Sequence, residues 1–299
     1  ELESYAMKSS GYEVQSFGES KSFFKDVCER FVKNKRAMIA LVIFLIIALM
    51  AIFGPMISPY SYDGMDTAIM NQRPSTAHWF GTDRFGRDLF TRVLYGARIS
   101  LMVGIVTAVI NTIIGVIYGG IAGYVGGRVD MWMMRLTDIL YSIPELLYII
   151  LIMLIFGSNV RSIIIGVCVA GWISMARMVR SQIITLKEQE FALAAFVLGA
   201  NSRRILFKHL IVNSLGTIIV TVTLMIPQAI FMEAFLSFVG VGISAPMASL
   251  GTLAQDARTY LEIFPYQMLF PVAAICVTIF SLNFIGEGLN SALNPKGKR

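Results

Sequence analysis

The sequence has 299 residues, of which 56% are hydrophobic and only 15% are charged, and its mean hydropathy is +0.69. Soluble domains carry about one quarter charged residues, so this composition excludes an ordinary water-soluble protein. The formal net charge of +6 could indicate nucleic-acid binding, but in so apolar a chain basic loops that set the membrane orientation explain it better.

Six apolar segments are long enough to cross a hydrocarbon core of about 30 Å as α-helices. They are residues 37–57, 99–121, 137–156, 162–179, 215–239 and 266–289. Residues 37–53 are continuously apolar, whereas the strands of a membrane β-barrel alternate apolar and polar residues over about ten positions. The sequence therefore predicts an all-α polytopic membrane protein with six transmembrane helices.

The positions of Lys and Arg predict how these helices are oriented. If both termini are cytoplasmic, the basic residues before residue 37, at 128–135, around 187–213 and at the C-terminus share the cytoplasmic side, as basic loops generally do. The predicted regions are then a cytoplasmic N-terminal tail (1–36), a first transmembrane helix with an extracellular loop (37–98) and a core of five helices (99–299). Residues 250–263, in a second outer segment, are predicted to form a short helix at the membrane surface.

The extracellular loop contains a compact group of charged residues, Asp83, Arg84, Arg87 and Asp88. These residues could form a salt-bridge cluster that shapes an outer docking surface. They could instead belong to a structural turn in which Gly81 and Gly86 supply backbone freedom. We favour the structural turn, because exposed ion pairs contribute little free energy.

Polar residues within the predicted helices are candidates for a translocation pathway, because a carboxyl group inside a membrane commonly marks a lumen or a paired site. Glu145 follows Pro144, and Glu233 follows Pro227; prolines permit the bending that alternating access needs. An interfacial position or a buried structural partner would also explain each carboxyl group, and Glu233 is the weaker candidate. The predicted pathway residues are Pro144, Glu145, Gln228 and Glu233, and Asn111 and Asn283 could also face it.

The most polar interruption of the apolar pattern is residues 187–213. Helix-forming residues predict one helix over 186–198, and Asn201 or Ser202 can cap a second over 202–211, after a break at Gly199. Small residues leave one surface of the first helix open, and basic residues follow it. This segment could lie on anionic lipid or dock on a protein partner. The candidate docking residues are Glu190, Ala194, Ala195, Gly199, Arg203, Arg204, Lys208 and His209.

Motifs for covalent chemistry are absent from the sequence. There is no GxxxxGK(S/T) phosphate-binding loop, so the chain is not expected to bind or hydrolyse ATP itself. His78 and His209 lie on opposite sides of the membrane in the predicted orientation, and the cysteines lack CxxC spacing. We therefore expect no catalytic residue, no metal site and no bound cofactor in this chain.

Several segments resemble one family of membrane proteins. Residues 194–199 resemble the EAA motif of bacterial ATP-binding-cassette (ABC) importer permeases, E-A-A-x3-G followed by I-x-L-P, although Leu193 replaces the glutamate and Val212 the proline. Residues 78–88 resemble the H-x-x-GTD-x-x-GRD signature of dipeptide, oligopeptide and nickel permeases, specifically their C-type subunit. Residues 95–101, 123–127, 134–138, 233–242 and 283–295 are also similar to that family.

This resemblance implies a type I ABC importer permease fold, in which residues 187–213 form a cytoplasmic coupling loop. It implies a non-catalytic subunit that moves oligopeptides or dipeptides across the bacterial cell membrane, together with a homologous B-type permease. ATP and Mg would bind to two cytoplasmic ATPase subunits, and an extracellular substrate-binding protein would deliver the peptide. A nickel importer is the alternative within the family; an ion-gradient-driven secondary transporter or a membrane enzyme would belong to other classes.

Overall fold

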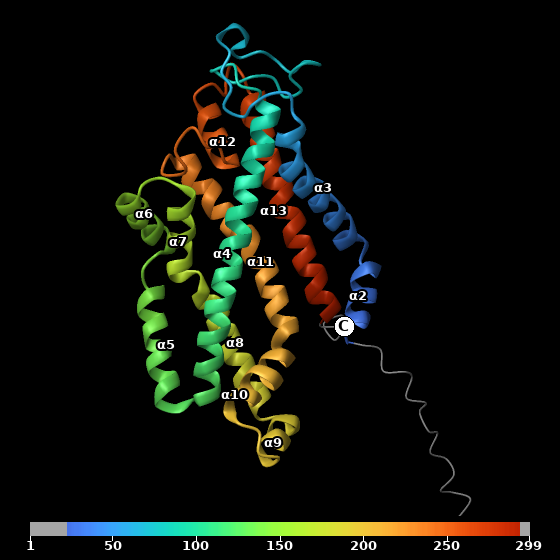
Figure 1. Ribbon diagram of the computed structural model, residues 1–299, viewed down its shortest axis with the longest axis vertical. Coiled ribbons are helices and arrows are strands. Elements are labelled where there is room, and N and C mark those ends of the chain that lie inside the picture. Colours follow the sequence, from blue (N-terminus) through green and yellow to red (C-terminus); the bar gives the residue numbers. More distant parts are fainter. Residues whose placement is uncertain (1–22, 294–299) are drawn as a thin grey trace, which may run out of the picture.

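The computed structural model describes residues 23–293, and the regular elements in this range are helices (Figure 1). They are α2 (Phe23–Lys33), α3 (Lys35–Ile57), α4 (Leu89–Val125), α5 (Gly127–Tyr141), α6 (Glu145–Phe156), α7 (Val160–Ala170), α8 (Trp172–Lys187), α9 (Glu190–Val197), α10 (Ser202–Arg204), α11 (Ile211–Val239), α12 (Leu250–Arg258) and α13 (Tyr266–Leu293). A 3-10 turn, η1 (Thr67–Ile69), and a π-helical segment, η2 (Ile205–Leu210), complete the set. Residues 1–22 of the predicted N-terminal tail and the basic residues of the C-terminus lie outside the described range.

Five helical segments are long and apolar enough to cross a membrane. They are Lys35–Ile57, Leu89–Val125, Val160–Lys187, Ser202–Val239 and Tyr266–Leu293, and they correspond to the first, second, fourth, fifth and sixth predicted spans. α5 and α6 correspond to the third, but they are bent by 73° and form a sixth span only if they are counted together. The prediction of an all-α, multi-pass membrane protein is confirmed.

The bend between α5 and α6 has a local cause. α5 ends at Tyr141 and α6 begins at Glu145, with Pro144 at the N-cap position. Proline disfavours the helical conformation in the residue before it and lacks the N–H group that a helix interior requires. The predicted third span over 137–156 therefore consists of two helices separated at Pro144, the residue that was expected to permit bending there.

The second predicted span, residues 99–121, is only the middle of α4, which has 37 residues. At a rise of 1.5 Å per residue the helix is about 55 Å long, well beyond a hydrocarbon core of about 30 Å. The Asp88 side chain caps its first turn by accepting a hydrogen bond of 2.8 Å from the Thr91 backbone N–H. Arg92 and Arg98 interrupt the apolar pattern in the first ten residues, so hydropathy alone did not reveal this extension.

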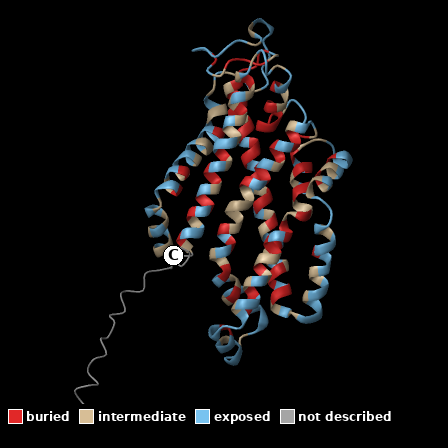
Figure 2. Ribbon diagram, turned by 180° about the vertical axis from the view of Figure 1, so that it is seen from behind, coloured by how far each residue is buried: buried red, intermediate tan, exposed pale blue. Residues whose placement is uncertain are grey.

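α4 occupies the centre of the bundle and packs against α3, α8 and α11. Buried residues follow the facing sides of the central helices (Figure 2). Gly115, Gly119 and Gly123 bring α4 close to α8: a Cβ atom on Gly119 would lie only 2.1 Å from the carbonyl oxygen of Ala176. Small residues at such spacing allow two membrane helices to approach backbone to backbone. α8, which leads directly to the 187–213 segment, is thus packed against the middle of the molecule.

Residues 58–88 form a long loop at the end of the bundle opposite α9 (Figure 1). Phe80 stacks on Phe270 with ring centroids 3.9 Å apart, and the Tyr266 hydroxyl donates a hydrogen bond of 2.8 Å to the Gln72 carbonyl oxygen. These two contacts hold the loop against α13. The short helix predicted within 250–263 is confirmed as α12, which packs against α11 and α13 at the same end.

Candidate functional site

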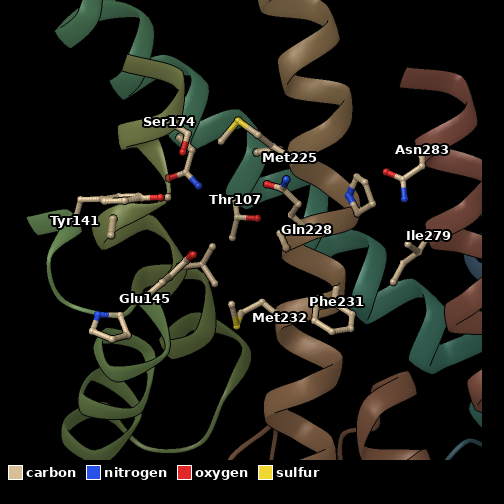
Figure 3. Close-up of a pocket in the computed structure, with 18 of the residues that line it drawn as sticks. Thr107, Tyr141, Glu145, Ser174, Met225, Gln228, Phe231, Met232, Ile279 and Asn283 are labelled. Carbon is tan, nitrogen blue, oxygen red and sulfur yellow. The ribbon is translucent and has the colours of Figure 1, made fainter. Parts of the chain in front are cut away.

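The bundle contains a cavity of about 660 Å³. Its walls come from α4, the α5–α6 break, α7, α8, α11 and α13 (Figure 3). Much of the wall is apolar, with Met225, Phe231 and Met232 among the larger side chains. The polar side chains on it are Thr107, Asn111, Tyr141, Glu145, Ser174, Gln228 and Asn283. Apolar walls with a few placed polar groups are typical of sites that bind small molecules.

Three of the four predicted pathway residues line this cavity: Pro144, Glu145 and Gln228. Asn111 and Asn283 also line it. The break at Pro144 positions Glu145 in the first turn of α6, and its side chain extends toward Thr107 on α4 (Figure 3). The cavity therefore gathers polar residues from six helices, α4, α5, α6, α8, α11 and α13.

Glu233 occupies a different environment. Its side chain is fully buried, and it is not among the residues that line the cavity. Its carboxyl oxygens accept hydrogen bonds of 2.7 Å from the Ser100 hydroxyl and 2.8 Å from the Ser237 hydroxyl. The Ser249 hydroxyl, at the N-cap of α12, lies 3.4 Å from that of Ser237. These contacts join α11 to α4 and α12, which is the buried structural role considered as the alternative for this residue.

α9 projects beyond the bundle at the end opposite the 58–88 loop (Figure 1). α8 ends at Lys187 and α9 begins at Glu190, so the helix predicted over 186–198 is divided after its first two residues. The distal end of α9 is apolar and exposed: Phe196 is 70%, Val197 82% and Leu198 87% exposed. Exposed apolar surfaces are typical of sites that contact another protein or a membrane.

The predicted docking residues lie on α9, on the turn that follows it, and on α10 and η2. Ala195 and His209 are half-buried, and the exposed ones are Glu190, Ala194, Gly199, Arg203, Arg204 and Lys208. Gly199 has φ = +81° and no atom within 4 Å of an added Cβ, so the backbone conformation, not a close contact within this chain, favours glycine there. Asn201 accepts a hydrogen bond of 2.8 Å from the Arg204 N–H, which confirms the predicted cap. Within the described part of the chain, Arg203, Arg204 and Lys208 form no ion pair.

The second helix predicted in this segment, 202–211, is continuous with α11. Its middle part is the π-helical η2, which makes a wider turn than an α-helix. Ile205, Leu206 and Leu210 of η2 are buried in a cluster with Met175, Val179 and Ile183 of α8 and Ala192 of α9. α9 therefore packs against α8 and η2, and η2 is continuous with α11. Both α8 and α11 also contribute residues to the cavity.

The charged residues of the 58–88 loop form a buried network. Arg87 Nε lies 2.6 Å from Asp83 Oδ2, and these residues are only 5% and 7% exposed. Positive φ angles at Gly81 and Gly86 support the predicted structural turn. Sequence reasoning missed three partners that complete the network: His78, 2.9 Å from Asp88, and Arg92 and Asp256. Asp256 is in α12, far along the chain, and no local pattern pairs it with this loop.

The cavity is equipped for binding. Its hydroxyl and carboxamide groups can donate and accept hydrogen bonds, its carboxyl group can accept them, and its apolar side chains offer a surface for apolar parts of a ligand. Within residues 23–293, no group of three or more His, Cys, Asp or Glu side chains is arranged to hold a metal ion.

Comparison with known proteins gives consistent results along the chain. Residues 115–299 match the family described as binding-protein-dependent transport system inner membrane component. Residues 22–74 match the N-terminal TM domain of oligopeptide transport permease C. The chain is 49% identical over 277 residues to an oligopeptide transport system permease protein of Bacillus subtilis, covering 93% of this chain and 91% of that one. It is 47% identical over 281 residues to a Bacillus subtilis dipeptide transport system permease protein, covering 94% and 88%. It is 45% identical over 282 residues to an Escherichia coli oligopeptide transport system permease protein, covering 94% and 93%.

Proposed function

The chain belongs to the family of binding-protein-dependent transport system inner membrane components, and we propose that it is the permease subunit of an ABC importer that carries peptides into the bacterial cell. Relatives named for oligopeptide and dipeptide transport match most of its length, which favours peptide over nickel as the substrate. The cavity of about 660 Å³ lies among the membrane-spanning helices, where a transported substrate must pass.

In this proposal, α9 docks on a cytoplasmic ATPase. The exposed apolar end of α9 would be covered by a groove of the ATPase, and Arg203, Arg204 and Lys208 would face acidic side chains around it. Because α9 is mounted on α8 and η2, its displacement would move the helices that carry Ser174 and Gln228. ATP hydrolysis on the partner would thereby change the cavity, and this chain would perform no covalent chemistry.

The remaining partners follow from the same proposal. A homologous permease would complete the substrate pathway, and two ATPases would bind ATP and Mg. An extracellular binding protein would deliver peptide at the end formed by the 58–88 loop and α12. α9 and both termini would be cytoplasmic, in agreement with the distribution of Lys and Arg.

The exposed apolar end of α9 is the observation that carries this proposal. Contact between apolar side chains and water is unfavourable, so a partner that covers this surface would stabilise it. The test is Leu198→Asp, followed by affinity purification in mild detergent. We expect the variant to retain the second permease and to lose the ATPases.

The matched control is Val129→Asp, a change to the same residue type at a side chain that is 44% exposed in the first turn of α5, which follows the end of α4 that contacts Lys187. It should retain the ATPases. Full recovery of the ATPases with Leu198→Asp would contradict docking through α9, and purification of the wild-type chain without any ATPase would contradict an ABC importer.

A further inference from the structure

The described residues of the cavity wall include an acidic side chain but no basic one. Among the described residues that line it, Glu145 carries a carboxyl group, three carry carboxamides, and none is Lys, Arg or His. A substrate with a positively charged end would find acceptors here, whereas a carboxylate would find no cationic partner on this wall and would be repelled by Glu145.

Asn111 supplies an acceptor with no partner inside the protein. The residue is only 3% exposed, and its Oδ1 atom is buried without a hydrogen bond. The amide is confined by α8: a Cβ atom on Gly171 would lie 2.5 Å from Asn111 Nδ2. A buried, unpaired oxygen is costly in a folded protein. A ligand N–H group that enters the cavity would satisfy it.

Glu145 is the second such acceptor. It is half-buried, and within the described residues its carboxyl group makes no hydrogen bond or ion pair. Its position in the first turn of α6, directly after the break at Pro144, places this unpaired carboxyl group on the cavity wall. Glu145 is on α6 and Asn111 is on α4, so the two acceptors belong to different walls of the same cavity.

We infer that this cavity recognises the N-terminal ammonium group of a peptide through Glu145 and Asn111 Oδ1. The inference rests on the proposed peptide-import function. An importer of peptides with varied side chains can rely only on the groups that all peptides share: the ammonium, the backbone amides and the terminal carboxylate. Of these, the ammonium offers three N–H donors and a positive charge, which match the two acceptors.

The test is uptake by the complete transporter in proteoliposomes, with trialanine and N-acetyl-trialanine as probes. Every variant is assayed with the same binding protein. For each probe, uptake by the variant is divided by uptake by the wild type, and this ratio removes the binding protein's own preference for one probe over the other. We expect Glu145→Gln to lower trialanine uptake about tenfold, as loss of a hydrogen bond to a charged group does, and N-acetyl-trialanine uptake by less than about twofold. Glu145→Asp should restore most of the trialanine uptake.

Glu287→Gln is the matched control, because Glu287 is exposed on α13 and does not line the cavity; it should leave both ratios near one. Equal loss of both probes in Glu145→Gln, or loss of neither, would overturn the inference. If Glu145→Gln fails to assemble, Glu145→Ala carries the same expectation and the same contradiction. A wild-type complex that transports neither probe nor any other peptide would show that the proposed function itself is wrong.

Discussion

Glu145 and Glu233 look alike in the sequence, since each is a carboxyl group that follows a proline within an apolar segment. Their surroundings differ completely. Glu145 lines the cavity and makes no hydrogen bond within the described residues, whereas Glu233 is fully buried and accepts hydrogen bonds from two serine hydroxyls. Burial and partners, therefore, separate a residue that can face substrate from one that joins helices.

Replacing Glu233 tests its structural role. Glu233→Ala would leave the buried hydroxyls of Ser100 and Ser237 without their acceptor, so we expect the free energy of unfolding to fall by about 1–3 kcal/mol. The measurement is thermal unfolding in detergent, with Glu262→Ala at an exposed position as the control. Equal transition temperatures for the two variants would contradict this role.

The loop network gives a second residue-level prediction. Arg87→Met would remove the nearest cation from the buried Asp83 carboxylate, which should destabilise the protein by about 3 kcal/mol. Arg161→Met, at an exposed arginine, should have little effect in the same unfolding measurement. A small effect of Arg87→Met would mean that Arg92, 3.6 Å from Asp83, is a sufficient partner.

The contact between α4 and α8 belongs to the scale of the element, and two adjacent glycines allow it to be tested. A Cβ atom on Gly119 would meet the Ala176 carbonyl oxygen at 2.1 Å, whereas one on Gly120 would find its nearest neighbours at 3.6 Å. Gly119→Ala should therefore push the helices apart and cost about 1–3 kcal/mol. Gly120→Ala should be tolerated, and similar unfolding of both variants in detergent would contradict the close approach of the two backbones.

Local signals predicted several elements correctly. The run of 37–53 predicted α3, and Asn201 was one of two predicted caps, with Ser202; its side chain accepts the hydrogen bond from the backbone N–H three residues later. Features that depend on residues far apart in the sequence could not be predicted. Hydropathy did not predict that Arg92 lies within α4, because a charged residue interrupts the apolar pattern. Its acidic partner in space, Asp256, belongs to α12, far along the chain. Pro144 was expected to bend one span, but the turn before it divides that span into α5 and α6.

At the scale of the whole molecule, the cavity and the proposed docking segment around α9 lie apart but share helices. The cavity takes Ser174 from α8 and Gln228 from α11, and both helices lead to the segment that carries α9. Asn111, Glu145, Gln228 and Asn283 could be named from the sequence, whereas Thr107, Tyr141 and Ser174 were added to the cavity by the packing of the helices. Glu233, six residues after Pro227 on α11, does not line the cavity; its serine partners lie on α4 and on its own helix.

The most direct measurement is uptake of a labelled oligopeptide by proteoliposomes that contain this chain with its partner permease, the ATPases and the binding protein. We predict accumulation only when ATP is supplied on the side where the ATPases bind, and none when a proton gradient is imposed without ATP. Accumulation driven by the proton gradient in liposomes that lack the ATPases would contradict an ATP-driven permease.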